Sequence, residues 1–218
     1  MTNSWRNPPS NPSAEQIAAV NELLQSIGQA PVSTLDTSNP DVSIAWNTLV
    51  STSRDVQAEG WTFNRENHIQ LNRSAAAGTV NYILLASNEL QVDLVNDVAN
   101  QHHNAVIRKD GANIILYDKE QHSKTWTYDP IADKIFYFDW ENLPIPIQSY
   151  IIARAAAICS SRITGDMNQY QMLKQREDYC RAQAIEYDTS QGDYSYFGLD
   201  THTSGYRTYQ PIQSLNRY

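Results

Sequence analysis

The sequence predicts an α+β protein in which a four-helix bundle is interrupted by an antiparallel β subdomain and flanked by extended N- and C-terminal arms. Two observations predict this class. Apolar residues recur with a helical period over residues 13–60 and 141–189, and they alternate with a period of two over residues 61–140. The chain has 218 residues, 41% of them hydrophobic, so it is long enough to bury a sizeable core. Two helical hairpins split by an insertion most simply pack as one bundle.

Residues 1–12 are rich in proline and asparagine and are expected to form a flexible N-terminal arm. Residues 13–60 are expected to form the first helical hairpin, because two apolar stripes with helical spacing are each opened by a capping residue and closed by a glycine. The first stripe opens with a capping box, and the second opens with an asparagine followed by a proline. The expected caps are Ser13 with Gln16 and Asn39 with Pro40, and the expected stops are Gly28 and Gly60.

Residues 61–140 are predicted to form the antiparallel β subdomain. Lys109-Asp110-Gly111 between two apolar stretches is a strong hairpin signal, and Ser87-Asn88 indicates a second turn. Trp61 and Phe63 begin the alternating pattern and are expected to be core residues rather than a binding platform. Strands are expected around residues 61–63, 69–71, 80–84, 90–94, 106–108, 114–116, 126–128 and 135–138.

Residues 141–189 are predicted to form the second helical hairpin. Gly165 ends the third helix, and Asp166 caps the fourth. Cys159 and Cys180 fall within helical patterns and are expected to be small core residues, which excludes a disulfide framework and indicates synthesis in a reducing compartment. On the fourth helix the residues expected at solvated positions are Lys174, Arg176, Glu177 and Asp178, and those expected on the apolar stripe are Tyr170, Leu173, Cys180, Ala184 and Tyr187.

The last segment, residues 190–218, is expected to be an extended, tyrosine-rich tail. It contains no Lys and no Glu and is formally neutral, whereas a free tail is usually charged. Tyrosine offers a large contact area at a small entropy cost, so the tail is interpreted as a partner-binding segment. Packing against its own domain is an equally supported alternative. The candidate partner-binding residues are Tyr194, Tyr196, Phe197, Tyr206 and Tyr209.

The net charge of −8 and the isoelectric point near 5.0 argue against a protein whose main task is binding nucleic acid phosphates. Its partners are therefore expected to be proteins. The sequence has no apolar run long enough to span a bilayer and no signal-peptide pattern, so neither a membrane partner nor export by that route is expected. Phosphate-loop, nucleophile-elbow, zinc-protease, Cys-x-x-Cys and dinucleotide motifs are absent, and no cofactor, metal or catalytic residue is predicted.

Two weaker groups of residues are candidate sites. Four histidines, His68, His102, His103 and His122, have side chains that bind zinc or transfer protons, but their polar surroundings favour solvated loop residues. Asp139 and Glu141 flank Trp140 and resemble the carboxylate pair of a glycan-cleaving site. The favoured interpretation is that these acids stabilise the start of the following helix.

Two sequence elements carry a resemblance to a known family. The string from Ala19 to Asp36, AVNELLQSIGQAPVSTLD, is followed by Gly60-Trp-Thr-Phe-Asn64. Together they resemble the tail tubular protein A family, the head-to-tail adaptor or gatekeeper proteins of short-tailed bacteriophages. The likeness continues through the hairpin at residues 109–111 and through Leu143-Pro144 into the third helix, and it covers most of residues 14–189.

The resemblance implies a structural virion protein of the tail, made in the host cytoplasm. Family members assemble as a ring, typically a dodecamer, below the portal protein and above the nozzle formed by tail tubular protein B, and DNA passes through the channel without sequence-specific binding. An acidic chain agrees with this, because it lowers the attraction for phosphates. Two alternatives stay open: a tail-associated glycan hydrolase that acts on host surface polysaccharide through Asp139 and Glu141, and a plain protein-binding module.

Overall fold

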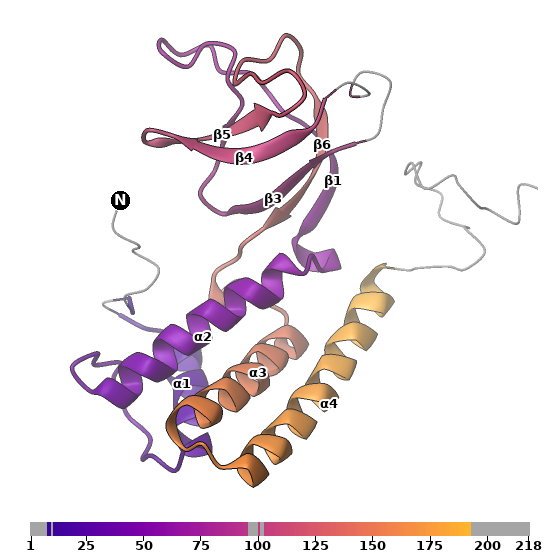
Figure 1. Cartoon of the computed structure of the whole chain (residues 1–218). Coiled ribbons are helices and arrows are strands. Elements are labelled where there is room, and N and C mark those ends of the chain that lie inside the picture. The colour runs from indigo at the N-terminus through magenta and orange to yellow at the C-terminus, as the bar shows by residue number, and fades with distance from the viewer. Residues whose placement is uncertain (1–7, 10, 96–99, 101–102, 193–218) are drawn as a thin grey trace, which may run out of the picture. The chain divides into compact units, whose positions relative to one another are not determined.

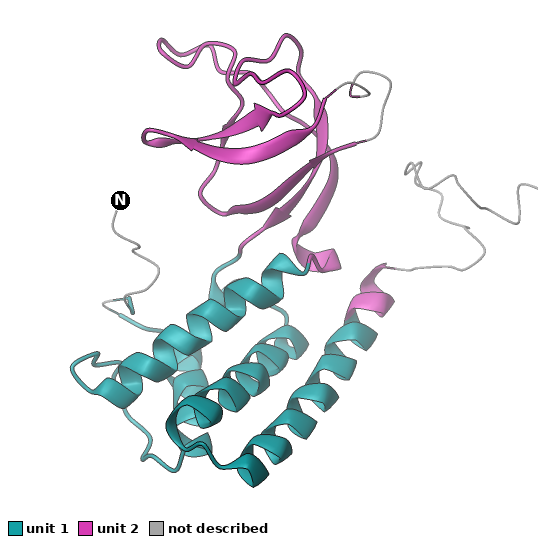
Figure 2. Cartoon of the chain, in the orientation of Figure 1, with its two compact units in different colours: residues 1–59, 138–187 teal, residues 60–137, 188–218 magenta. Residues whose placement is uncertain are grey.

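The computed structural model describes residues 8–9, 11–95, 100 and 103–192 (Figure 1). Four α-helices and two antiparallel sheets of three strands each lie in these ranges, which confirms the predicted α+β class. The chain divides into two compact units (Figure 2). The helical unit comprises residues 1–59 and 138–187, and the β unit comprises residues 60–137 and 188–218.

Local capping signals begin the first, second and fourth helices where the sequence predicts. Ser13 and Gln16 form the reciprocal capping box of the first helix, and the Asn39 side chain accepts a hydrogen bond from the Asp41 amide, 3.0 Å away, at the start of the second. Asp166 accepts from the amide of Asn168 at the start of the fourth. The helices are α1 (Ala14–Ser26), α2 (Pro40–Ala58), α3 (Ile145–Ile163) and α4 (Met167–Gly192).

The core of the helical unit is formed by α1, α2 and α3. Tyr150 is 1% exposed, and the close-packed alanines of α3 let its neighbours approach. Cys159 and Cys180 are both buried, as predicted. The main buried side chains of these three helices are Val20, Leu23, Leu24, Val42, Ala45, Trp46, Leu49, Val56, Ile147, Tyr150, Ile151, Ala153, Ala155, Ala156, Ala157 and Cys159.

Helix α4 is less buried than α2 and α3, because only Glu177, Cys180 and Ala184 are buried along its 26 residues. The expectation of a solvated Glu177 is therefore wrong. Glu177 lies three and seven positions before Cys180 and Ala184, so it falls on the same helix face as these two residues. Its carboxylate is held by Lys174, one turn earlier, at 2.8 Å. The helix also continues to Gly192, so the first residues of the predicted tail, 190–192, are helical.

The β unit contains two sheets, with strand orders β1-β6-β3 and β2-β5-β4. The predicted hairpin is confirmed, because Asp110 of β4 pairs with Asn113 of β5 across the two-residue turn Gly111-Ala112. The buried cluster between the strands is Leu71, Ile83, Leu85, Val92, Leu116, Trp126 and Ala132. The strands are β1 (Arg65–Gln70), β2 (Leu84–Leu85), β3 (Glu89–Leu94), β4 (Ala105–Asp110), β5 (Asn113–Asp118) and β6 (Ile131–Phe136).

Three of the expected strand segments are wrong. Trp61 precedes a 3₁₀ turn at Thr62–Asn64 rather than starting a strand, although it is buried as predicted. Residues 80–82 lie in a loop, where Asn81 has a left-handed backbone (φ +63°) that no regular strand contains. Residues 126–128 are also irregular, because Trp126 is anchored by its indole Nε1, which donates to the Leu116 carbonyl at 3.0 Å.

Candidate functional sites

The predicted partner-binding residues Tyr194, Tyr196, Phe197, Tyr206 and Tyr209 all lie outside the described residues. Their role therefore stays a prediction. The described part of the segment, residues 190–192, forms the last turn of α4.

Asp139 and Glu141 do not lie on one face of a strand. They lie at a 3₁₀ turn, Trp140–Asn142, and not on a strand, so a spacing of two places them on different sides of the backbone. Both side chains are exposed. Trp140 between them is 8% exposed and is not available as a platform for a sugar ring.

The histidines divide into two kinds. His68 and His122 are exposed, as predicted, and His102 lies outside the described residues. His103 is different, because its Nδ1 pairs closely with the buried carboxylate of Asp118 at the end of β5. Its ring centroid lies 5.7 Å from that of Trp126 and 5.1 Å from that of Tyr128. The expectation that all four are solvated loop residues is therefore wrong for His103.

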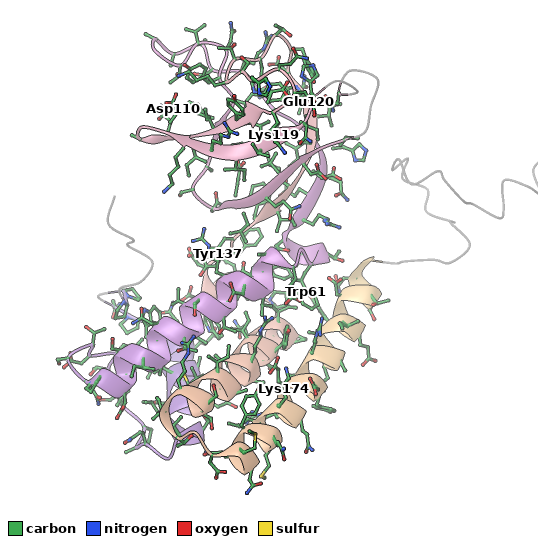
Figure 3. All side chains as sticks on the ribbon, viewed as in Figure 1. Trp61, Asp110, Lys119, Glu120, Tyr137 and Lys174 are labelled. Atoms are coloured by element: carbon green, nitrogen blue, oxygen red, sulfur yellow. The ribbon has the colours of Figure 1, made fainter. Side chains whose placement is uncertain are left out.

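Asp118 is the centre of a hydrogen-bonded clamp in the β unit. Its Oδ1 accepts from the backbone amides of Glu120 at 2.9 Å and Gln121 at 3.3 Å, in the turn that carries Lys119 and Glu120 (Figure 3). Burial by itself raises the pKa of Asp118, but hydrogen bonds from His103 and from three backbone amides outweigh burial and lower the pKa below its ordinary value. The ionised carboxylate is therefore the stable form, and it fixes the turn.

Tyr128 and Asn100 extend this clamp to β6. The Tyr128 hydroxyl donates to Asn100 Oδ1 at 2.7 Å, and Asn100 Nδ2 donates to the carbonyls of Val95 and Ile131. Burial, with a smaller contribution from the Asp118 charge, raises the pKa of Tyr128. Each polar group has a structural partner, so the cluster holds loops together. Sequence reasoning missed it because its members are far apart in the chain; Asp118 at a strand end followed by a turn was the only local signal.

A second polar group lies in the helical unit, around a hollow of about 360 Å³ between α3 and α4. Arg154 donates to Glu59 at 2.7 Å and to the Tyr150 hydroxyl at 3.2 Å. Across the hollow, Lys174, labelled in Figure 3, neutralises Glu177. Both acids thus have a basic partner, and the charges serve the packing of α4 rather than an acid–base reaction.

No group of three or more His, Cys, Asp or Glu side chains in the described ranges is arranged to hold a metal ion. No described helix is long and apolar enough to cross a membrane.

The polar clusters of both units support packing and turns. Comparison with known proteins gives the class directly: the model of the tail tubular protein family matches residues 17–194. The chain therefore belongs to the tail tubular protein family, a family of structural components of phage tails that are generally not enzymes. This confirms the resemblance drawn from residues 19–36 and 60–64. The search of curated proteins found no match.

Proposed function

We propose that this chain is the head-to-tail adaptor of a short-tailed phage, a ring that joins the portal to the tail nozzle and forms part of the DNA ejection channel. The family match over residues 17–194 carries the proposal, because it places the chain among tail structural proteins. Residues 19–36 and 60–64 resemble tail tubular protein A in particular. Among tail structural proteins, this resemblance supports the role of the adaptor. The net charge of −8 agrees with a channel through which DNA passes without sequence-specific binding.

The proposed partners are the portal protein, the nozzle protein (tail tubular protein B) and further copies of this chain, twelve in the typical ring. In this proposal the helical bundle, residues 13–60 and 141–189, packs side by side around the ring. The β subdomain, residues 61–140, contacts the nozzle or neighbouring subunits. The protein is made in the host cytoplasm and ends in the virion tail.

The C-terminal aromatic residues are proposed as anchors on the portal or on an adjacent subunit. Because α4 continues to Gly192, a truncation after this residue removes the tail and keeps the helix whole. A matched full-length variant replaces Tyr194, Tyr196, Phe197, Tyr206 and Tyr209 with serine, which keeps the length of the tail. Both variants are expected to fold and to lose portal binding, whereas retained binding in both overturns the anchor role.

Native mass spectrometry tests the adaptor itself. The purified chain is measured alone and after mixing with the portal protein of the same phage. A ring of about twelve copies on the portal supports the proposal, and its appearance only after mixing identifies assembly on the portal template. A chain that does not bind the portal contradicts the adaptor role, while membership of the tail tubular family still stands.

A further inference from the structure

Helix α4 exposes large apolar side chains and buries a carboxylate. Met172 is 72% exposed and Tyr179 is 65% exposed, whereas Glu177 is only 7% exposed. The other two buried residues of the helix, Cys180 and Ala184, are small. Helices α1, α2 and α3 instead bury large apolar side chains. The position that α4 occupies on the helical unit is therefore stabilised by little apolar burial.

Neither side of α4 is apolar throughout. On the exposed side, the charged Glu186 follows Met172 and Tyr179 at intervals of seven residues. On the packed side, Tyr170 and Leu173 are only half-buried. Helix α4 thus presents neither a continuous apolar face to solvent nor a fully buried one to α1 and α3.

The buried carboxylate of Glu177 does not fasten α4 to a neighbouring helix. Its ion pair, at 2.8 Å, is with Lys174 of the same helix, and Lys174 also lies 3.9 Å from Asp178. Removing a carboxylate from water costs free energy, and an ion pair within one helix offsets part of this cost without joining two helices. Glu177 would regain its hydration if α4 moved away from α3.

Two hollows flank α4. The hollow of about 360 Å³ between α3 and α4 has Glu177 in its lining, and a second hollow of about 430 Å³ between α1 and α4 is lined in part by Leu173 and Arg176. Protein interiors are normally close-packed, so two hollows along one helix indicate incomplete packing.

Several of the contacts that hold α4 are polar. They include Arg176 with Glu22, Gln169 with Ser26, and Asp188 with Thr62. The side chains of Arg176 and Glu22 are 56% and 36% exposed, and an ion pair at this exposure contributes little to stability. Such contacts exchange for contacts with water at a small net cost.

We propose that α4 is a movable strap, which opens from α1 and α3 while the rest of the helical unit stays folded. The closed position gains little apolar burial and keeps Glu177 from water, so the free-energy gap to the open state is small. We also expect the strap to open when the chain assembles, because a chain that forms a ring only on the portal needs a free state that differs from the assembled one. This second step rests on the proposed adaptor role, whereas the opening itself does not.

The two native cysteines test the opening without any partner protein. Cys180 is buried on α4, and Cys159 is buried on α3. The full-length chain is treated with iodoacetamide in urea well below the unfolding midpoint, and the modified peptides are measured by mass spectrometry. Cys180 is expected to react roughly tenfold faster than Cys159, at a rate that rises with urea. Equal rates, or a Cys180 rate independent of urea, would overturn the strap.

Replacing Glu177 with Leu tests the cause of the opening. An apolar side chain at this buried position favours the closed state, so labelling of Cys180 is expected to slow several-fold while labelling of Cys159 is unchanged. Loss of a nearby negative charge by itself would speed the reaction, because it favours the thiolate. Asp178→Leu, at a neighbouring exposed carboxylate, is the matched control and should not slow labelling. A Cys180 rate in Glu177→Leu that is unchanged or faster would show that the buried carboxylate does not drive opening.

A cross-link tests whether assembly requires the strap to open. Glu22→Cys and Arg176→Cys replace two side chains that are in contact, so a short bismaleimide can fasten α4 to α1. The pair is made in a Cys180→Ala background, because Cys180 lies one turn from Arg176. By native mass spectrometry, the cross-linked chain is expected to form few or no rings on the portal. The unreacted pair and the two reagent-treated single variants should assemble as the wild type does.

The outcomes separate the two proposals. Full assembly of the cross-linked chain would overturn the requirement for opening and leave the adaptor role intact. Failure of the wild type to bind the portal would contradict the adaptor role, while the labelling of Cys180 would still decide whether the strap opens.

Discussion

The side chain of Gln57 pairs with the backbone of Phe138 as one strand pairs with another. Gln57 Oε1 accepts from the Phe138 amide at 2.8 Å, and Gln57 Nε2 donates to the Phe138 carbonyl at 3.1 Å. Gln57 is fully buried near the end of α2, and Phe138 lies where the chain returns to the helical unit after the β subdomain. One amide side chain therefore satisfies both polar groups of a residue 81 positions away.

Replacing Gln57 with Leu is expected to destabilise the helical unit by about 2–4 kcal/mol, because it leaves the amide and the carbonyl of the half-buried Phe138 without these partners. Urea unfolding followed by far-UV circular dichroism measures the loss. Gln25→Leu, on an exposed position of α1, is the control and should change stability by less than about 0.5 kcal/mol. Equal stability of the two variants would show that the Gln57 pair contributes nothing.

Replacing Gly60 with Ala is expected to destabilise the β unit for two separable reasons. The backbone has φ +78°, which costs about 1 kcal/mol for a residue with a Cβ, and the added Cβ would lie 2.6 Å from Cδ1 of the buried Ile135. Gly78→Ala is the matched control, since Gly78 has φ +83° and open space around the Cβ position. In thermal unfolding, the melting temperature is expected to fall further for Gly60→Ala than for Gly78→Ala. The difference between the two losses measures the cost of the clash with Ile135.

The substitution Ile135→Val removes the Cδ1 atom that would clash with the added Cβ. It therefore tests whether this clash causes the extra loss of stability in Gly60→Ala. The double variant Gly60→Ala with Ile135→Val is expected to be more stable than the sum of the two single losses implies. Strict additivity would mean that the cost at Gly60 comes from the backbone alone.

Replacing Asp118 with Asn is expected to destabilise the β unit most at neutral pH. Because the pKa of Asp118 is lowered in the folded state, its ionised form stabilises the fold fully above the ordinary value of 3.8, and this contribution is lost as the pH falls through the folded-state pKa. The difference from wild type in urea unfolding should therefore be constant above about pH 5 and shrink below about pH 4. Asp93→Asn, an exposed carboxylate on β3, is the control. A difference that stays constant down to pH 3 would contradict the clamp.

The double variant Asp139→Asn with Glu141→Gln is expected to fold and to bind the portal as the wild type does, because both carboxylates are exposed. Release of reducing sugar from polysaccharide of the host surface is expected from neither protein. Release by the wild type that is lost in the variant would instead favour the glycan-hydrolase alternative.

The amino-acid sequence by itself predicts the elements whose signals are local. The capping box of Ser13 and Gln16, the Asn39-Pro40 start and the Asp110-Gly111 hairpin each depend on atoms within a few residues of one another, so pattern and spacing are sufficient. The family was also recognisable from two short strings, because such strings record ancestry and require no three-dimensional information.

Tertiary structure decided the roles of polar residues whose partners are distant in the chain. His103 was expected in solvent and instead pairs with Asp118, and Glu177 was expected in solvent and instead lies on the buried face of α4. A buried polar group is stable only where its hydrogen bonds are satisfied, and those partners come together only when the chain folds. Hydrophobic periodicity predicts which elements form, but it contains no information about which distant amide or carboxylate will complete them.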